Sequence, residues 1–507
     1  MTLMGKGAKL ACVVLLSTHL FGCNGSDGNS SGDDAQTREP SEALHDQSAR
    51  SSDRMWASRF LGTVDIIYRN GRMVRTGAVL IDEQTVAMSA SKLFGAESAR
   101  VFWECCAPRD IAEVIGYDAA LDIALVHIES PLTDPGTIPV RELPTGTDAP
   151  LRIVLALPLR IEEMVGYTEL ETQVVGLHEW SGYGEAIVFQ SEPDIVLDGS
   201  IVVDHEGYPL AFLNGWGGSE HDLGIRFKRV LQVERHEPIK MSDFTPSSAP
   251  AEHRSFAFAY HAQTLRNREQ YDDAYASLLD CLELNPDQWL GLYELGVLQD
   301  MMGNDLQGAA ETMRESIAAE DAWSESHYSL GLIEYKRGKY QEAIESLRLA
   351  DQLDPFNPDV HQMLGLSLME LEGAESALPN MERAQDLAPD VYMYLSNLVF
   401  AYKEAGKPTL ARDRLLRFVD ENPDEPEGRS GLGYYWIQQR EPELALEQFE
   451  WLDLNTETTP EILVRVAFCL METGDRLKAE ETLDRLAAMD AGHELLPVLR
   501  KRLEQDD

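Results

Sequence analysis

Residues 55–240 contain Ser, His and Asp side chains of the kinds that carry out acyl transfer. That chemistry needs a hydroxyl nucleophile, an imidazole that takes its proton and a carboxylate that orients the imidazole. Asp122 and Asp198 supply carboxylates, and Ser200 supplies a hydroxyl close to Asp198. His127 falls on a predicted strand and His205 in a predicted turn, and we expect structural or solvated roles for both. The segment therefore offers parts of this chemistry without an evident imidazole base.

The elements that would position these residues are short β-strands. Apolar and β-branched runs recur along the segment with turn residues between them. Asn70-Gly71 separates the first two runs and is a strong signal for a hairpin turn. A segment of this length made of short antiparallel strands suits a double β-barrel. The predicted strands are 60–68, 73–81, 99–103, 112–117, 123–128, 152–157, 172–177, 186–190, 201–203 and 209–213.

Three motifs in this segment resemble, in chain order, the trypsin-like serine proteases of the Deg/HtrA type. Residues 76–81 followed by 85–91 resemble the strands that lead to the catalytic His of that family. Residues 116–126 resemble the strand that carries the catalytic Asp, and residues 198–207 resemble the nucleophile loop and the hairpin after it. The resemblance covers most of 55–240 and implies an all-β trypsin-like double barrel.

The same resemblance assigns the three triad positions, and two of them have changed. The general base position holds Ser91, the nucleophile position holds Asp198, and only Asp122 matches the family. Without an imidazole, Asp122 has nothing to orient. Val196 and Leu197 stand where the family shapes its oxyanion hole, and a β-branched Val resists the backbone that Gly provides there. We therefore expect a pseudoprotease with no catalytic residue.

Other interpretations of the segment remain open. One is an active envelope serine endopeptidase whose second half recruits substrates, and fluorophosphonate labelling at Ser200 or Ser91 would favour it. A weaker one pairs Asp198 with Asp122 as acid and base. Residues 213–217 resemble the edge that pairs with a substrate backbone in trypsin-like enzymes, and such an edge could hold a peptide without cutting it. A simple Trp-Gly loop is the alternative for those residues.

The second half of the chain repeats itself. Seven alanines follow one another at steps of 35 or 34 residues, an apolar residue lies four positions after each, and a small residue lies near twelve positions before most of them. Self-similarity at a fixed period indicates stacked supersecondary units. The alanines are Ala274, Ala309, Ala343, Ala377, Ala411, Ala445 and Ala479.

This period and pattern resemble the tetratricopeptide repeat. In that family, the small residue lets two helices approach closely, and a Pro ends the second helix and begins the next repeat. We predict an all-α tetratricopeptide superhelix at 255–493, reached through a linker at 241–254 and closed by a capping helix within 494–507. The repeats are predicted at 255–288, 289–323, 324–357, 358–391, 392–425, 426–459 and 460–493.

The resemblance implies an interaction platform, with a groove lined by the first helix of each repeat. One subtype clamps a terminal carboxylate, but of its positions here only Asn397 fits, so we reject that clamp. We expect an apolar or aromatic peptide segment with basic flanks, while core packing of the same side chains is the alternative. The groove candidates are Tyr293, Tyr328, Leu332, Tyr335, Phe400, Tyr434, Ile437 and Phe468.

The first residues resemble a bacterial lipoprotein signal. Lys6 and Lys9 precede an apolar stretch at 10–21 that is shorter than the roughly 20 residues a membrane-spanning helix needs. Residues 20–23 resemble the lipobox, in which the Cys is lipidated and the signal is removed before it. We predict a signal peptide at 1–22, lipidation of Cys23 and a flexible tether at 23–54 that is rich in Gly, Ser and Asp. An ordinary signal with an incidental Cys23 is the alternative.

Composition limits the partners. Asp and Glu outnumber Lys and Arg by 87 to 43, for a net charge of −44, which disfavours nucleic acid. We expect protein or peptide partners, and contact with a membrane only through the lipid, on the outer membrane facing the periplasm. Cys105 and Cys106 are adjacent, and Cys281 and Cys469 fall on distant helices, so we predict no disulfide framework, metal or cofactor.

Overall fold

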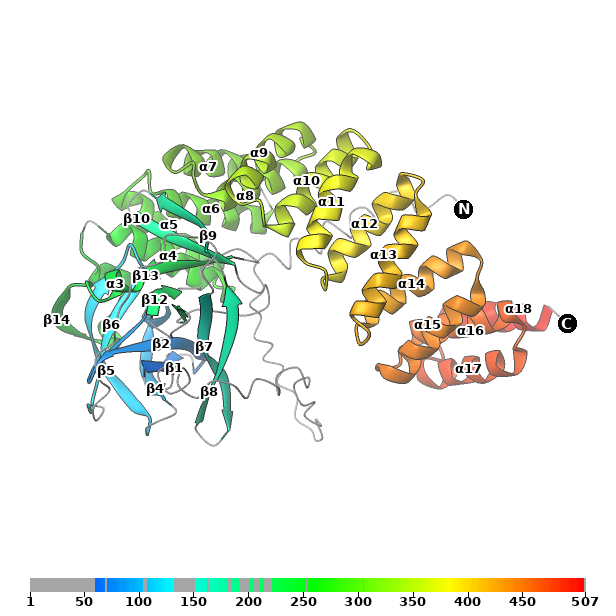
Figure 1. The fold of residues 1–507 in the computed structure, drawn as a ribbon, viewed down its shortest axis with the longest axis horizontal. Helices are drawn as coiled ribbons and strands as arrows, with labels where there is room; N and C mark the ends of the chain where they lie inside the picture. Colours follow the sequence, from blue (N-terminus) through cyan, green and yellow to red (C-terminus); the bar gives the residue numbers. More distant parts are fainter. Residues whose placement is uncertain are drawn as a thin grey trace. The chain divides into compact units, whose positions relative to one another are not determined.

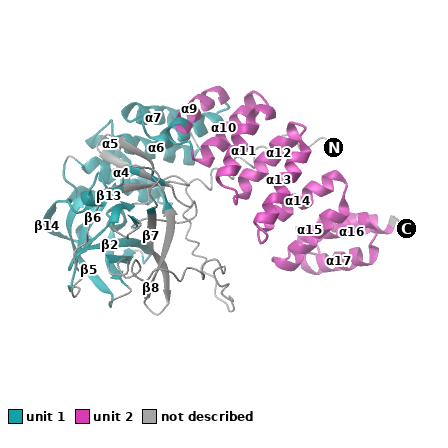
Figure 2. Cartoon of the chain, in the orientation of Figure 1, with its two compact units in different colours: residues 1–338, 352–355 teal, residues 339–351, 356–507 magenta. Residues whose placement is uncertain are grey.

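The computed structural model describes residues 60–68, 71–103, 107–131, 151–161, 164–172, 174–180, 184–190, 200–204, 209–213, 221–251, 253–303 and 305–505 (Figure 1). Two compact units make up the chain (Figure 2). The first comprises Met1–Gly338 with Gln352–Pro355, and the second comprises Lys339–Asp351 with Phe356–Asp507. The β domain and the first repeat helices share the first unit. Every helix of the described residues is too short or too polar to span a bilayer.

Six strands of the first unit close into a β-barrel. The sheet order is β14-β5-β4-β1-β2-β3-β6, and a further pairing between β5 and β6 joins the ends of the six-stranded ring. Closure leaves these strands without free edges, and β14 adds to the outside of β5. The strands are β1 Leu61–Tyr68, β2 Met73–Asp82, β3 Thr85–Ser89, β4 Ala96–Phe102, β5 Arg109–Asp118, β6 Ile123–Ile128 and β14 Arg235–Lys240.

The first hairpin forms where its turn residues predict it. β1 and β2 pair in antiparallel fashion, with Ile67 opposite Met73. Gly71 has a φ of +79°, a left-handed conformation that Gly adopts without the steric cost of a Cβ. The Gly71 N–H donates to the carbonyl of Tyr68 at 2.8 Å, which closes the turn.

A second sheet of the first unit has the order β8-β7-β11-β12-β13-β10-β9. Some of its described apolar residues, among them Ile187, Phe189, Val202 and Leu213, form a buried cluster of their own. Three strands of the two sheets were not predicted from the sequence. These are β8, of which only the last residue was included, and the whole of β13 and β14. The strands are β7 Leu151–Ile161, β8 Met164–Thr172, β9 Val174–Trp180, β10 Gly184–Gln190, β11 Ile201–Val203, β12 Pro209–Leu213 and β13 His221–Arg226.

The segment that we predicted to be a linker, 241–254, packs into the barrel instead. Met241, Phe244 and Ala249 are buried in the same cluster as the barrel strands. The ring of Phe244 stacks on Phe94 at 5.2 Å and meets Tyr117 edge-on at 5.1 Å. These three buried side chains make the segment part of the core, so the prediction of a linker at 241–254 was wrong.

Regular helix pairs follow the β domain. Each of the seven periodic alanines is 0% exposed, because the early part of each second helix packs against its neighbours. Five helices begin with a Pro at the first position, where its missing N–H costs nothing. The helices are α4 Arg254–Arg266, α5 Tyr271–Leu284, α6 Trp289–Met302, α7 Leu306–Ala319, α8 Ser324–Lys336, α9 Tyr340–Leu353, α10 Pro358–Leu371, α11 Ala374–Leu387, α12 Tyr392–Glu404, α13 Pro408–Glu421, α14 Pro426–Gln439, α15 Pro442–Asn455, α16 Pro460–Thr473, α17 Arg476–Met489 and α18 Leu496–Gln505.

The small residue of the first helix does what the pattern predicts. A Cβ built on Gly365 of α10 would lie 2.6 Å from Cγ of Met381 and 3.4 Å from the carbonyl of Ala377, both on α11. A Cβ on Gly433 of α14 would lie 2.7 Å from the ring of Phe449 on α15. These distances leave no room for a side chain, so Gly allows the paired helices to approach this closely.

Candidate functional site

The structure brings together two of the three residues that the sequence comparison assigned to triad positions, Ser91 and Asp122. Ser91 begins a short 3-10 helix after β3, and Asp122 ends the turn between β5 and β6. The Ser91 hydroxyl donates to Oδ2 of Asp122 at 2.7 Å, and the Ser91 N–H donates to Oδ1 at 2.7 Å. Ser91 is 5% exposed and Asp122 2% exposed, so the pair is closed to solvent. Asp122 therefore orients the Ser91 hydroxyl, whereas we had expected it to have nothing to orient.

The turn that carries Asp122 is held from several sides. Asp122 has a φ of +53°, and its carbonyl accepts the N–H of Ala90 at 2.9 Å. The carboxylate of Asp118 accepts the N–H of Leu121 at 3.1 Å. From helix α4, the hydroxyl of Tyr260 donates to the carbonyl of Ala120 at 3.1 Å. These bonds fix the Asp122 carboxylate against Ser91.

No described contact gives this pair an imidazole base. His261 on α4 contacts Phe94, just after the Ser91 helix, with ring centroids 5.5 Å apart. Burial, helped by the charge of Arg268, lowers the pKa of His261 to about 4, so its ring is neutral at neutral pH. Its Nδ1 lies 3.4 Å from the hydroxyl of Ser277, which donates to a backbone carbonyl. The Ser91–Asp122 pair can therefore hold the turn together.

The remaining residues of the protease comparison are only partly within the described chain. Asp198, Val196, Leu197, His205, residues 214–217 and Cys23 lie outside the described residues. Ser200 is buried at the start of β11, where its carbonyl accepts the N–H of Leu213 at 2.9 Å. His127 is half-buried on β6 opposite Thr85 of β3.

Cysteines and metal ligands give no further site in the described residues. Cys281 and Cys469 are free, and burial raises the pKa of each thiol to about 12, which keeps both protonated. No cluster of three or more metal-ligating side chains occurs within the described ranges.

The first repeat and the β domain share one hydrophobic core. Tyr260 of α4 and Trp289 of α6 lie in the same buried cluster as Leu121, Phe212 and Phe227 of the β domain. Beside this cluster, the guanidinium of Arg268 lies 3.9 Å from the ring centroid of Tyr68 on β1. The helix that starts the array is therefore part of the surroundings of the Ser91–Asp122 pair.

Three of the predicted groove residues are core residues. Tyr293, Tyr328 and Leu332 are 3%, 6% and 5% exposed. The ring of Tyr293 lies against Trp323, with centroids 4.8 Å apart, and burial raises its pKa well above the ordinary value. These three side chains are buried and leave no exposed surface for a ligand, so the groove assignment was wrong for them.

Three other candidates form what we call the aromatic strip: Phe400, Tyr434 and Phe468. They occupy the same position of α12, α14 and α16, with 34 residues between successive members. Phe400 is 40% exposed, Tyr434 is 39% exposed, and Phe468 is half-buried. Ile437, one helical turn after Tyr434, is half-buried, as is Tyr335 of the first unit. The second unit therefore presents aromatic rings to solvent from consecutive repeats.

Side-chain contacts between the first helices show that the strip is continuous. Lys403 of α12 donates a hydrogen bond to Gln438 of α14. Arg465 of α16 donates to the hydroxyl of Tyr434 at 3.2 Å, and its guanidinium lies 4.9 Å from that ring centroid. At the end of the array, the guanidinium of Arg502 lies 5.4 Å from the Phe468 ring. These contacts place the aromatic rings and three basic side chains on one surface of the second unit.

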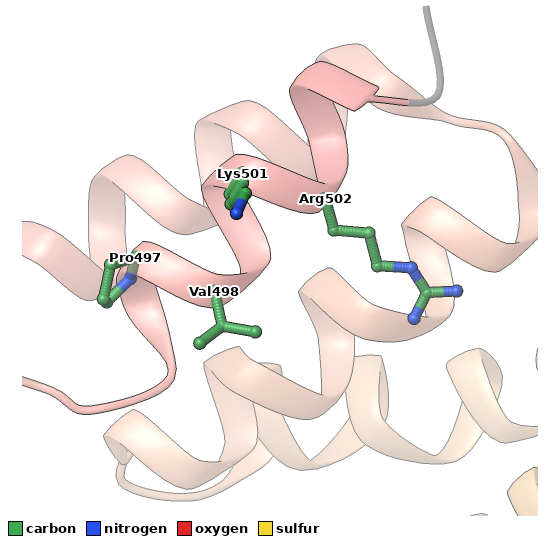
Figure 3. Close-up of a pocket in the computed structure, with 4 residues that line it drawn as sticks. All are labelled: Pro497, Val498, Lys501 and Arg502. Carbon is green, nitrogen blue, oxygen red and sulfur yellow. The ribbon is translucent and has the colours of Figure 1, made fainter.

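A surface pocket adjoins the end of the strip. Its volume is about 470 Å³, and it is lined by four residues of α18: Pro497, Val498, Lys501 and Arg502 (Figure 3). All four come from a single helix, and Val498 is 59% exposed. The pocket therefore combines apolar and basic side chains on α18, as the strip does on the helices before it.

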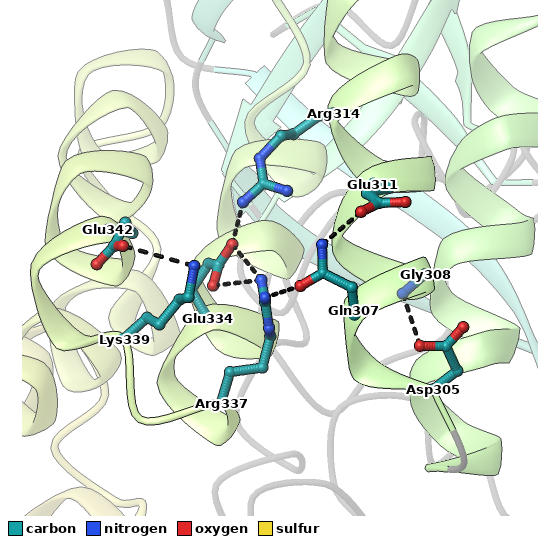
Figure 4. Close-up of polar contacts among 9 residues, drawn as sticks. All are labelled: Asp305, Gln307, Gly308, Glu311, Arg314, Glu334, Arg337, Lys339 and Glu342. Carbon is teal, nitrogen blue, oxygen red and sulfur yellow. Dashed lines mark hydrogen bonds and ion pairs between the residues drawn. The ribbon is translucent and has the colours of Figure 1, made fainter.

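Buried carboxylates stabilise the first unit. Glu294 of α6 pairs with Arg266 of α4 at 2.9 Å, and both side chains are almost fully buried. Burial alone would lower the pKa of Arg266, but the Glu294 carboxylate outweighs burial and raises it. On α8, the Glu334 carboxylate accepts hydrogen bonds from both Arg314 and Arg337. Arg337 also donates to Gln307 of the preceding helix, α7 (Figure 4). Glu294 and Glu334 thus each pair with an Arg from a neighbouring turn or helix.

Comparison with family models identifies the helical half. The model described as "TPR repeat" matches residues 331–371, and the model described as "Tetratricopeptide repeat" matches residues 399–452. The second match contains Phe400 and Tyr434. No match was found among curated proteins.

Several solved structures are similar to parts of the chain. The C-terminal part of a TPR repeat-containing protein from Cytophaga hutchinsonii is 16% identical, covers 48% of this chain and 98% of its own, and has a TM-score of 0.41. PilF of Pseudomonas aeruginosa is 16% identical, covers 51% and 99%, and has a TM-score of 0.32. A protease of M. tuberculosis in its active form is 12% identical, covers 42% and 98%, and has a TM-score of 0.32. On the evidence of the family models and its helix pairs, this chain contains tetratricopeptide repeats, which follow an N-terminal β-barrel.

Proposed function

We propose that the chain is a non-catalytic scaffold or assembly adaptor of the bacterial cell envelope that binds other proteins through its repeats. The observation that carries this proposal is the aromatic strip. Phe400 and Tyr434 expose about two fifths of their surface on a rigid helical frame. Tyr and Arg are enriched among residues that dominate binding energy at interfaces, and Tyr434 with Arg465 is such a combination.

The frame keeps these rings in place without a ligand. Gly433 precedes Tyr434, and its contact with Phe449 fixes α14 against α15. The Tyr434 ring also meets Phe449 edge-on at 5.6 Å. Side chains held by a packed backbone lose little conformational freedom on binding, which favours affinity.

The β domain is proposed to be a degenerate trypsin-like double barrel. The barrel ring and the order of its motifs support this, and so does the place of Ser91 beside Asp122, where the family has its His and Asp. A Ser in that place cannot accept the proton of a nucleophile, and its own proton is donated to the carboxylate. The domain would then serve as a support for the repeats or hold a peptide without cutting it.

The location of the protein is proposed from its first residues. A lipid on Cys23 would anchor the chain to the outer membrane, with the tether at 23–54 and the folded units on the periplasmic side. Cys23→Ser should release the protein from the membrane fraction or leave the signal uncleaved. Processed variant protein that still sediments with membranes would contradict the anchor.

Site-specific photocrosslinking tests the binding role. We expect p-benzoylphenylalanine placed at Tyr434 to give discrete adducts in cells, and Phe400→Ala in the same chain to reduce them severalfold by removing the neighbouring ring. The matched control places the crosslinker at Tyr275, which is 45% exposed on α5 of the first unit. Melting curves of each variant monitor the fold. Equal adducts at both positions, or none at Tyr434, would reject the strip as a binding surface.

A further inference from the structure

Two basic side chains of the aromatic strip, Lys403 and Arg465, are held by neutral partners. Within the described residues, Lys403 and Arg465 have no carboxylate within ion-pair distance; their partners are the Gln438 amide and the Tyr434 hydroxyl and ring. Some other basic residues of the second unit do pair with carboxylates: Lys407 with Glu375, Arg414 with Asp386, Arg485 with Asp453 and Arg500 with Asp484.

The two charges lie beside the exposed rings. Lys403 follows Phe400 by one turn of α12, and Arg465 precedes Phe468 by one turn of α16 while its head group rests on Tyr434. Neutral partners hold both side chains in place and leave their positive charge available. The strip is therefore a row of rings with a fixed cation near each end.

The carboxylates of the same helices do not cancel this arrangement. Glu472 is occupied by Arg502 of α18. Glu427 and Glu461 lie in the first turns of α14 and α16, about two helical turns before the rings. Glu404 is exposed next to Lys403, and it makes no ion pair with Lys403. Within the described residues, the charged side chains in contact with the rings are Arg465 on Tyr434 and Arg502 on Phe468.

We propose that the aromatic strip binds a partner segment in which an apolar or aromatic side chain is flanked by carboxylates. The rings would take the apolar side chain, and Lys403 and Arg465 would pair with Asp or Glu on either side of it. This inference rests on the proposed binding function and reverses the charge that the net acidity of the chain suggested. The cations beside the rings determine the preferred charge of the ligand, because an ion pair forms within a few Å. Exposed charges farther away than about 8–10 Å are largely screened at physiological salt.

Three synthetic peptides test this proposal with the full-length protein. All share a Trp-Leu-Phe core, and their flanks carry three Asp, three Gln or three Lys residues; fluorescence anisotropy at physiological salt measures their affinity. We expect the Asp-flanked peptide to bind tightest. Arg465→Gln and Lys403→Gln should each weaken it about three- to fivefold, as for partly exposed ion pairs, and leave the Gln-flanked peptide unchanged. Arg500→Gln and Lys407→Gln are the matched controls and should change neither peptide.

The outcomes separate this inference from the proposed function. Tightest binding of the Lys-flanked peptide, or no effect of Arg465→Gln and Lys403→Gln, overturns the acidic ligand. If Phe400→Ala weakens the Asp-flanked and Gln-flanked peptides equally and the flanks make no difference, the strip binds peptides but its cations do not select them. If no peptide binds and Tyr434 gives no photocrosslink, both proposals fail.

Discussion

Replacing Glu294 by Ala is expected to cost about 3–5 kcal/mol of the unfolding free energy of the first unit, the largest effect of any single change considered. The substitution leaves the guanidinium of Arg266 buried without its carboxylate, and an uncompensated buried charge costs that much. Gln263 would also lose its acceptor, since its amide donates to Glu294 at 3.0 Å. Urea denaturation followed by tryptophan fluorescence measures the loss, because Trp289 and Trp323 lie in the same unit.

Two further variants make this prediction specific to the buried charge. Glu342→Ala removes an exposed carboxylate that lies 3.7 Å from Lys339, and we expect a change of about 0.5 kcal/mol or less. Removing both charges, in Arg266→Met with Glu294→Leu, should recover most of the stability that Glu294→Ala loses. A loss below about 1 kcal/mol in Glu294→Ala would show that water reaches Arg266 and that the pair is not a buried one.

Replacing Asp122 by Ala is expected to destabilise the barrel by about 3–4 kcal/mol. Two hydrogen bonds from Ser91 to a charged group are lost. The Ala must also adopt a φ of +53°, which Asp and Asn tolerate better than other residues with a side chain. Asp122→Asn keeps one acceptor and the favourable backbone preference, so it should lose about half as much. Chemical denaturation of the full chain measures both.

The same variants distinguish a structural Asp122 from a catalytic one. Asp110→Ala, which removes an exposed partner of Arg100 on the same barrel, should change stability by less than about 0.5 kcal/mol. We expect no covalent labelling of the wild-type chain by a serine-directed fluorophosphonate, because Ser91 is buried and its hydroxyl donates its proton to Asp122. Labelling at Ser91 or Ser200 that disappears in Asp122→Asn would instead establish a working nucleophile.

The helical half was readable from the sequence because one local rule repeats. Ala309 and Ala377 are buried for the same reason, and Gly365 and Gly433 allow the same close approach. The β domain is less regular. β13 and β14 show no hydrophobic alternation, because both carry charged and imidazole side chains and β14 contains a Pro. They form strands because of their pairing partners in the sheets.

The candidate sites depended on contacts that no local pattern contains. The order of the protease-like motifs assigned Ser91 and Asp122 to two triad positions but gave Asp122 nothing to orient, whereas the structure places the Ser91 hydroxyl 2.7 Å from its carboxylate. The sequence could not indicate that Leu332 would be buried while Tyr434 stayed exposed, although both are the ninth residue of their helices, because a side chain at the same repeat position becomes core or surface according to the bulk of its neighbours. The neutral partners of Lys403 and Arg465 likewise come from other helices.

The core shared by the barrel and the first repeat has a consequence for biosynthesis. Translation proceeds from the N-terminus at about 5–20 residues per second, so the β-strands are complete before α4 and α6 exist. Until Tyr260 and Trp289 have been added, the apolar surface around Leu121 and Phe212 has no cover. The nascent β domain is therefore expected to be prone to aggregation for some seconds. The first helices of the array end this period when they pack against its apolar surface.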